Sequence, residues 1–248
     1  MNILVCISNV PDTTSKINFV ENDTRFDTQG VQFIINPNDE FGLTRAVWLQ
    51  QKQGAKITVV TVGDAGCEPI LRKCLAIGAD QAVRIDAVPT DGFSVAQELA
   101  AYAQAHAFDL IITGRESIDY NGGMVPGMLA GLLEIPFVTN CNGLEIESGT
   151  ATATREIDGG TEKVSTQLPL LIAAQKGLVE EDDLIIPNMR GIMQARKKSL
   201  EVLPSSTEAG ATTTLRFEKP QPKGAVKLVD AKDLDTLIDL LQNEAKVL

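Results

Sequence analysis

The sequence predicts an α/β fold with a doubly wound, mainly parallel sheet, and three observations support this prediction. Strand-like and helix-like segments alternate through the first two-thirds of the chain, which is the pattern of repeated βαβ units. The expected strands are apolar at their centres, as strands buried on both faces are. The chain has 248 residues, which is enough to bury a core without disulfides or a metal. An antiparallel β meander and a C-terminal arm complete the predicted architecture.

Each element of the alternating part is predicted from its apolar pattern and its end signals. Strands are expected at residues 2–8, 56–63, 81–86, 109–114 and 136–141. Helices are expected at residues 38–54, 66–80, 94–107 and 123–136. Gly54 and Gly78 follow the apolar periods of the first two helices, as C-cap glycines do. All of these elements belong to one predicted domain that spans residues 1–203.

Beyond Asn142 the pattern changes to alternating apolar and polar residues around glycine turns. The alternation and the turns at Ser148-Gly149 and Gly159-Gly160 predict an antiparallel meander over residues 144–174. A mixed-charge stretch, residues 180–199, is expected to be mobile. Residues 204–229, rich in Pro, Thr and Lys, are expected to form an extended linker.

Residues 230–248 predict a short helix with one apolar stripe. The stripe residues fall at positions i, i+3, i+4 and i+7 and are Leu234, Leu237, Ile238 and Leu241. Their full burial would contribute roughly 6–12 kcal/mol as an upper bound, which a lone helix on a long linker does not realise in water. The helix must therefore dock, and its periodicity leaves its own domain and another subunit equally open as docking surfaces.

Composition excludes several classes of function. A formal net charge of −11 disfavours nucleic acid as a partner. No apolar run approaches the roughly 20 residues that span a bilayer, so membrane insertion is not expected. The four cysteines are scattered, and the single His106 leaves a zinc site short of ligands. The first residues resemble no secretion or import leader, so a cytoplasmic location is expected.

Three loops follow predicted parallel strands at their carboxyl ends, where ligands bind in open sheets. They are residues 8–16, 62–66 and 114–127. The last loop is glycine-rich and runs into a helix, so its backbone N–H groups suit a phosphate. Glycines also serve ordinary turns, and both interpretations stay open. In the turn at residues 35–41, simple N-capping by Asn38 or Asp39 is the plainest interpretation.

Known catalytic motifs are missing from the sequence. It has no G-x-S-x-G, no phosphate loop of the G-x-x-x-x-G-K-[ST] type and no H-E-x-x-H. Neighbouring carboxylates occur in the run from Glu180 to Asp183, where a solvated face is the ordinary explanation. The sequence therefore indicates a binding protein without catalytic groups of its own.

A specific resemblance lies in and around the predicted meander. The residues that carry it are Ala153, Arg155, Asp158, Gly159, Gly160, Glu162, Val164, Pro169, Leu171, Ile172 and Ala173. At these spacings they resemble the signature of the β subunit of electron transfer flavoproteins. The resemblance extends over nearly the whole chain, through "NPNDEFGLTRAV", "LRKCLAIGADQAVRI", "GRESIDYNGG" and "MRGIMQARKKSLEV".

The resemblance implies a nucleotide-binding domain of the adenine-nucleotide α-hydrolase type and a heterodimer with an α subunit. The shared FAD supplies the redox chemistry, so this chain is expected to be an electron carrier subunit and not an enzyme. Electrons pass from acyl-CoA and related dehydrogenases to a membrane quinone oxidoreductase. Residues 184–202 are implied to be the partner-recognition loop, and the helix in 230–248 to dock on the α subunit.

The resemblance also implies the site residues. The adenine nucleotide is expected against Cys6, Asn36, Pro37, Asn38, Asp39, Val62, Gly114, Arg115, Ser117, Asp119, Asn121, Gly122, Gly123, Met124 and Val125. Partner contacts are expected at Met189, Arg190, Gly191 and Ile192. The family commonly has a glutamine, a small residue and a glycine where this chain has Met124, Val125 and Pro126, which favours backbone contacts there.

The identity of the nucleotide stays open between two forms of the family. "REIDGG" resembles members that bind a structural AMP, whereas "VPDT" and Asp39 resemble electron-bifurcating members, which bind a second FAD and take NADH as donor. AMP is the favoured expectation. Two functions of different classes also stay open. One is an ATP-using enzyme on the same fold, which lacks its usual S-G-G-x-D-S motif here, and the second is a nucleotide-sensing module without a redox partner.

Overall fold

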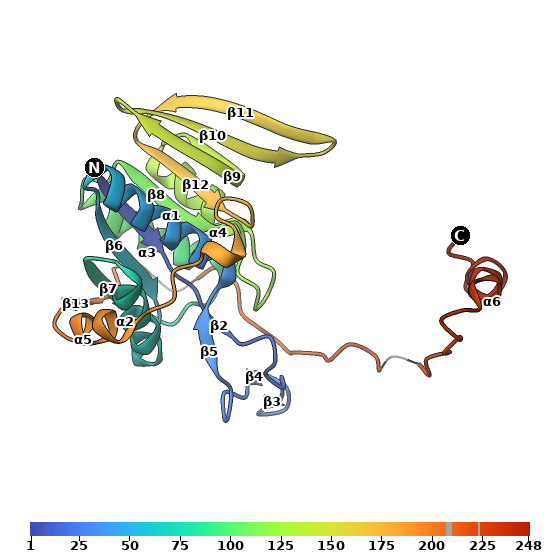
Figure 1. The fold of residues 1–248 in the computed structure, drawn as a ribbon. Helices are drawn as coiled ribbons and strands as arrows, with labels where there is room; N and C mark the ends of the chain where they lie inside the picture. Colours follow the sequence, from blue (N-terminus) through green and yellow to red (C-terminus); the bar gives the residue numbers. More distant parts are fainter. Residues whose placement is uncertain (207–209, 223) are drawn as a thin grey trace.

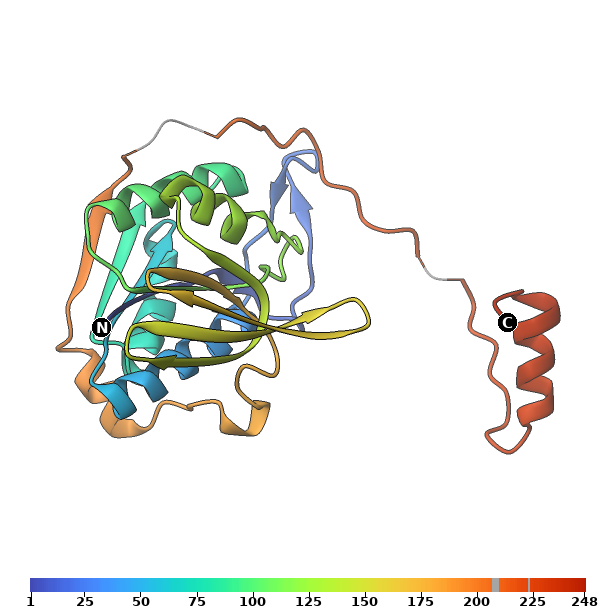
Figure 2. The ribbon, with the colours of Figure 1, turned by 90° about the horizontal axis from the view of Figure 1, so that it is seen from above.

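The structure is a computed structural model that describes residues 1–206, 210–222 and 224–248. Its body is a large sheet with helices on both faces (Figures 1 and 2). The strands of this sheet are β1 (Asn2–Cys6), β6 (Lys56–Val62), β7 (Gln81–Asp86), β8 (Leu110–Gly114), β9 (Phe137–Glu147), β10 (Thr150–Ile157), β11 (Gly160–Gln167), β12 (Leu170–Ala174) and β13 (Leu200–Pro204). The helices around it are α1 (Pro37–Gln53), α2 (Glu68–Ile77), α3 (Gly92–Gln104), α4 (Met124–Leu133) and α5 (Met189–Ala195), with short turns η1 (Ala65–Cys67) and η2 (Glu181–Asp183).

The predicted doubly wound α/β fold is confirmed. Within the described residues the strand order is β11-β10-β9-β12-β8-β1-β6-β7-β13, and β12, β8, β1, β6, β7 and β13 run parallel. Alternate residues of the central strand β1 face two different cores. Ile3 and Val5 pack with α1 and α2, whereas Leu4 and Cys6 pack with α3 and α4. The connections therefore cover both faces of the sheet.

The predicted meander differs from the structure at its final strand. β9, β10 and β11 are antiparallel, joined by turns at Ser148-Gly149 and Asp158-Gly159. β12, expected as part of the same meander, instead inserts between β8 and β9 and is parallel to both. Its sequence, LLIAA, is buried at every position, which is the pattern of a central parallel strand and not of a half-exposed one.

The mixed-charge stretch at 180–199, for which the sequence predicts mobility, is instead partly ordered against the body. α5 packs on α2, where Arg72 Nη1 donates to the carbonyls of Ala195 and Lys198, each at 2.9 Å. Lys198 Nζ in turn donates to the carbonyls of Leu75 and Ala79 beside the end of α2. These long-range hydrogen bonds also position β13, an edge strand that the sequence analysis missed.

Two small antiparallel pairs project from the carboxyl side of the sheet and were also not predicted (Figure 1). They are β2 (Asn9–Pro11) with β5 (Phe33–Ile35), and β3 (Phe19–Val20) with β4 (Arg25–Phe26). The β3–β4 turn holds Glu21, Asn22 and Asp23 at positive φ. Such short strands lack enough alternation to be recognised from sequence.

The C-terminal arm begins as an extended segment that is tied to the body. Phe217 stacks on Phe19 with ring centroids 4.7 Å apart, and Lys219 donates to the side chain of Asn18. The arm then leaves the body and ends in α6 (Leu234–Asp239) and η3 (Leu240–Glu244), which lie apart from the sheet in both views (Figures 1 and 2). Parts of the linker expected at 204–229, residues 207–209 and 223, lie outside the described residues.

Candidate functional site

Two of the three candidate loops, residues 8–16 and 114–127, meet at the carboxyl edge of the parallel strands, around the side chain of Asp39. One carboxylate oxygen accepts from the backbone N–H of Ser8, just after β1, at 2.7 Å. The other accepts from the backbone N–H of Gly114, at the end of β8, also at 2.7 Å. Asp39 lies in the first turn of α1, where a negative charge is favoured by the helix dipole. One buried side chain thus joins the ends of two neighbouring strands to a helix.

Gly114 is a glycine because of this close approach. A Cβ at Gly114 would meet the Asp39 carboxylate and would lie 2.8 Å from Cβ of Asn38, which real side chains do not tolerate. The sequence showed a glycine at the start of a loop, and the structure gives the reason. The glycine makes room for α1 against the end of β8.

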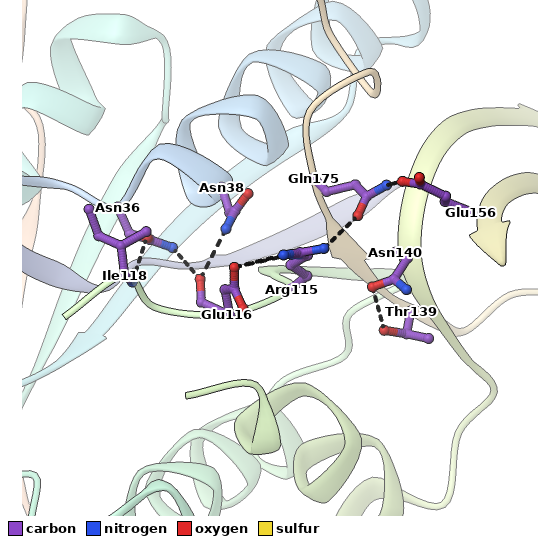
Figure 3. Close-up of polar contacts among 9 residues, drawn as sticks. All are labelled: Asn36, Asn38, Arg115, Glu116, Ile118, Thr139, Asn140, Glu156 and Gln175. Carbon is purple, nitrogen blue, oxygen red and sulfur yellow. Dashed lines mark hydrogen bonds and ion pairs between the residues drawn. The ribbon is translucent and has the colours of Figure 1, made fainter. Parts of the chain in front are cut away.

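The turn before α1 holds the third loop through side-chain amides (Figure 3). Asn36 Nδ2 donates to the carbonyl of Glu116 at 2.9 Å, and Asn36 Oδ1 accepts from the N–H of Ile118 at 3.3 Å. Asn38 Nδ2 also donates to the carbonyl of Glu116, at 3.3 Å. Asn36 occupies the N-cap position of α1 but makes no side-chain cap. The expected capping by Asn38 or Asp39 is also wrong, because these side chains bond to Glu116, Ser8 and Gly114 instead.

The rest of the 114–125 loop is closed by its own backbone. Ser117 and Gly122 exchange two N–H to carbonyl hydrogen bonds, each at 3.2 Å, and Gly123 takes the N-cap position of α4. Asp119 and Asn121 are exposed at the tip, while Met124 and Val125 open the helix. Cys6 and Val62 close the far side at the ends of β1 and β6, Cys6 buried and Val62 partly so. All fifteen expected nucleotide residues thus lie along one edge of the sheet.

The electrostatics of this edge are set by burial. Burial raises the pKa of Asp39 from its usual range to about 7, and the hydrogen bonds from Ser8, Asn36 and Gly114 oppose the rise. Burial, with a smaller contribution from Asp39, raises the pKa of the Cys6 thiol, so this thiol stays protonated. Cys6 can therefore pack against a ligand but offers no nucleophile.

A polar network that the sequence analysis missed connects this loop to the antiparallel strands (Figure 3). Gln175, directly after β12, accepts from Arg115 Nη1 at 3.4 Å and donates to Glu156 of β10 at 2.7 Å. Arg115 also donates to Glu116. The sequence offered only that Gln175 directly follows an apolar run. Its place beside Gly114 depends on the pairing of β8 with β12, which the sequence did not predict.

The expected partner residues lie on α5, away from the nucleotide edge. The side chain of Met189 is 74% exposed, and Arg190 and Ile192 are exposed beside it. Gly191 has a packing role, because a Cβ there would collide with the Ala76 carbonyl of α2. Of the basic cluster that follows α5, Lys198 turns back to the carbonyls of α2 and does not simply face solvent.

The described part of the chain gathers no set of three or more His, Cys, Asp or Glu side chains that could hold a metal ion. None of the helices in that part is both long and apolar enough to cross a membrane. Along this edge of the sheet the described residues offer backbone donors, amides, the buried Asp39, the more exposed Glu116 and Asp119, and the cation Arg115.

Comparisons with known proteins point in one direction. A family profile described as the electron transfer flavoprotein domain matches residues 23–208. The electron transfer flavoprotein subunit beta of Bacillus subtilis (strain 168) is 40% identical over 263 aligned positions, covering 100% of both chains. The proteins of the same name from Syntrophomonas wolfei and Homo sapiens are 32% and 31% identical, covering 100% and 94% of this chain and 98% and 95% of their own lengths.

Proposed function

We propose a function from one established premise: this chain belongs to the electron transfer flavoprotein family, as a beta subunit. A beta subunit of this family pairs with an alpha subunit. We infer that the heterodimer takes electrons from acyl-CoA and related dehydrogenases and delivers them to a membrane quinone oxidoreductase. The redox FAD is shared with the alpha subunit, and this chain holds a structural AMP.

The observation that carries the AMP assignment is the convergence on Asp39. Its carboxylate fixes the ends of β1 and β8, and Asn36 and Asn38 fix the loop that follows β8. Such pre-organised backbone suits an adenine nucleotide, because N–H groups recognise phosphate and base without rearrangement. Of the loop residues, Gly122, Gly123 and Met124 offer the backbone at the start of α4, and we assign the phosphate to that end.

The flavin supplies the redox chemistry when it is bound. The residues of this chain position the flavin and shield it. At this edge Asp39 is only 1% exposed, and Ser8, Asn36 and Gly114 donate hydrogen bonds to its carboxylate. This division of labour explains why the sequence offers no constellation of general acids, general bases or nucleophiles.

The test is to co-express the chain with its alpha subunit, denature the purified heterodimer and identify what is released. One FAD and one AMP per heterodimer are expected. Two FADs, together with reduction by NADH, would replace the proposal with the bifurcating form. No nucleotide beyond one FAD would reject an adenine site in this chain altogether, and turnover of ATP would favour an ATP-using enzyme.

The electron-transfer part is tested on the same preparation. Reduction of the bound flavin by an acyl-CoA dehydrogenase and its substrate should be fast compared with reduction by NADH. A heterodimer reduced by NADH alone, with no response to any acyl-CoA dehydrogenase, would contradict the proposed donors.

A further inference from the structure

The loop that we assign to the nucleotide contains a single cation, Arg115, among acidic side chains. Residues 114–125 include Glu116 and Asp119, and the buried Asp39 lies beneath the loop. The whole chain carries a formal net charge of −11. A nucleotide phosphate at this edge therefore meets a negative surface unless a cation faces it.

The guanidinium of Arg115 is held on one side and open on the other. Its Nε and Nη2 donate to Glu116 Oε1 at 3.3 and 2.9 Å, and its Nη1 donates to Gln175 Oε1 at 3.4 Å. A guanidinium has five N–H donors, so Nη1 and Nη2 each retain one without an acceptor among the residues that the structure describes. The side chain of Arg115 is 41% exposed, so a ligand can reach these donors.

Gln175 orients this guanidinium from a buried position, because it is only 5% exposed. Its Nε2 donates to Glu156 Oε2 at 2.7 Å, and a carboxylate can only accept. The amide nitrogen is thereby committed to Glu156, which leaves the amide oxygen to face Arg115. A glutamine in this place holds the guanidinium without cancelling its charge. A buried carboxylate there would cancel it.

We propose that Arg115 is the phosphate-binding cation of the nucleotide site and that Gln175, oriented by Glu156, is its positioning residue. The inference rests on the proposed function. Two adjacent N–H groups of a guanidinium match two oxygens of a phosphate, and such bidentate pairs are strong and directional. The antiparallel strands thereby contribute to nucleotide binding from outside the parallel sheet.

The experiment compares AMP with adenosine, which lacks the phosphate. Nucleotide-depleted heterodimer is titrated with each, using wild type, Arg115→Gln and Gln175→Leu. We expect both variants to bind AMP at least tenfold more weakly and adenosine within about twofold of wild type. The AMP affinity of wild type should also fall with added salt more steeply than that of Arg115→Gln, because the contact between phosphate and guanidinium is screened. Arg115→Lys should recover part of the lost AMP affinity, since it restores the charge without the fork.

Arg155→Gln is the matched control, because Arg155 pairs with Glu162 at 2.6 Å across the β10–β11 hairpin and, among the described residues, has no hydrogen bond or ion pair with the 114–125 loop. It should leave both affinities unchanged. An unchanged ratio of AMP to adenosine affinity in Arg115→Gln would overturn the inference. Because the Arg115 side chain is partly exposed, this variant stays decisive even if Gln175→Leu does not fold. Wild type that binds neither AMP nor adenosine would instead reject the proposed function itself.

Discussion

The edge of the sheet around Asp39 and the C-terminal arm differ in how their functional residues are held. At the edge, the side chains of Asp39, Asn36 and Asn38 are hydrogen-bonded to backbone groups far away in sequence, as Asp39 is to Gly114. Along the arm the apolar side chains of α6 remain uncovered, with Leu234, Leu237 and Ile238 all exposed. These hydrogen bonds form within one chain, whereas α6 presents a stripe whose burial needs another surface. The first region has a fixed geometry, and for the second we expect docking on another surface.

The largest expected difference is between the packed core of the body and the uncovered helix α6. Leu71→Ala, in the core between α2 and the sheet, should lower the free energy of unfolding by about 2–5 kcal/mol. Leu237→Ala, in α6, should change it by less than about 0.5 kcal/mol in the isolated chain. Urea denaturation of both variants measures the contrast. Equal losses would show that α6 packs on its own domain.

The next prediction concerns the close approach at the sheet edge. Gly114→Ala should cost about 1–3 kcal/mol and lower nucleotide content, because the new methyl displaces Asp39 or Asn38. Gly131→Ala is the control, since a Cβ there meets nothing within 4 Å and lies in α4. It should raise stability by about 0.5–1 kcal/mol through helix propensity. A tolerated Gly114→Ala would contradict the described packing.

The pH dependence of stability tests the buried carboxylate. The folded-state pKa of Asp39 is raised from 3.8 to about 7, so the folded state binds more protons than the unfolded state between these values. The contribution of Asp39 is fully present below about pH 4 and is lost as the pH rises through about 7. From pH 5 to pH 8 wild type should lose at least on the order of 1 kcal/mol relative to Asp39→Asn. Parallel pH profiles for the two proteins would refute this assignment.

Removal of the arm should separate assembly from stability. A chain truncated before Asp230 should keep its free energy of unfolding within about 0.5 kcal/mol, because α6 makes no packed contact with the sheet. It should bind the alpha subunit more weakly, since the truncation removes the apolar stripe on α6 that we expect to dock there. Gel filtration of both heterodimers at low concentration compares them. Full co-elution of the truncated form would place the docking function elsewhere.

The smallest expected effect on stability belongs to Met189→Ala on α5. The side chain is exposed, so the free energy of unfolding should change by less than about 0.5 kcal/mol. Electron transfer from each dehydrogenase should nevertheless slow, because a flexible thioether adapts to several docking pockets. Met193→Ala, exposed on the same helix, is the matched control for general surface effects. Rates that stay the same, or that fall only as stability falls, would exclude an anchoring role.

The sequence determined the order and type of the main elements. Apolar runs and glycine caps were sufficient for β1, β6, β7, β8 and the first four helices, because each of these signals is local. The family signature around Arg155 and Gly159 was also readable, since it depends on residue types at fixed spacing. The packing of α5 on the body could not be predicted from the sequence, because it depends on Arg72 and Lys198, which meet only after folding.

Only the tertiary structure decided where β12 inserts and what the polar residues of the edge do. A strand with an apolar sequence can pair in several positions, and its neighbours are chosen by burial on both faces. Asn38 looks like an ordinary cap in the sequence, and Gln175 was not singled out there. Their roles depend on Glu116, Arg115 and Glu156, which are distant along the chain and adjacent in space. Buried polar groups must find partners wherever the fold places them, and that placement is not a local property of the sequence.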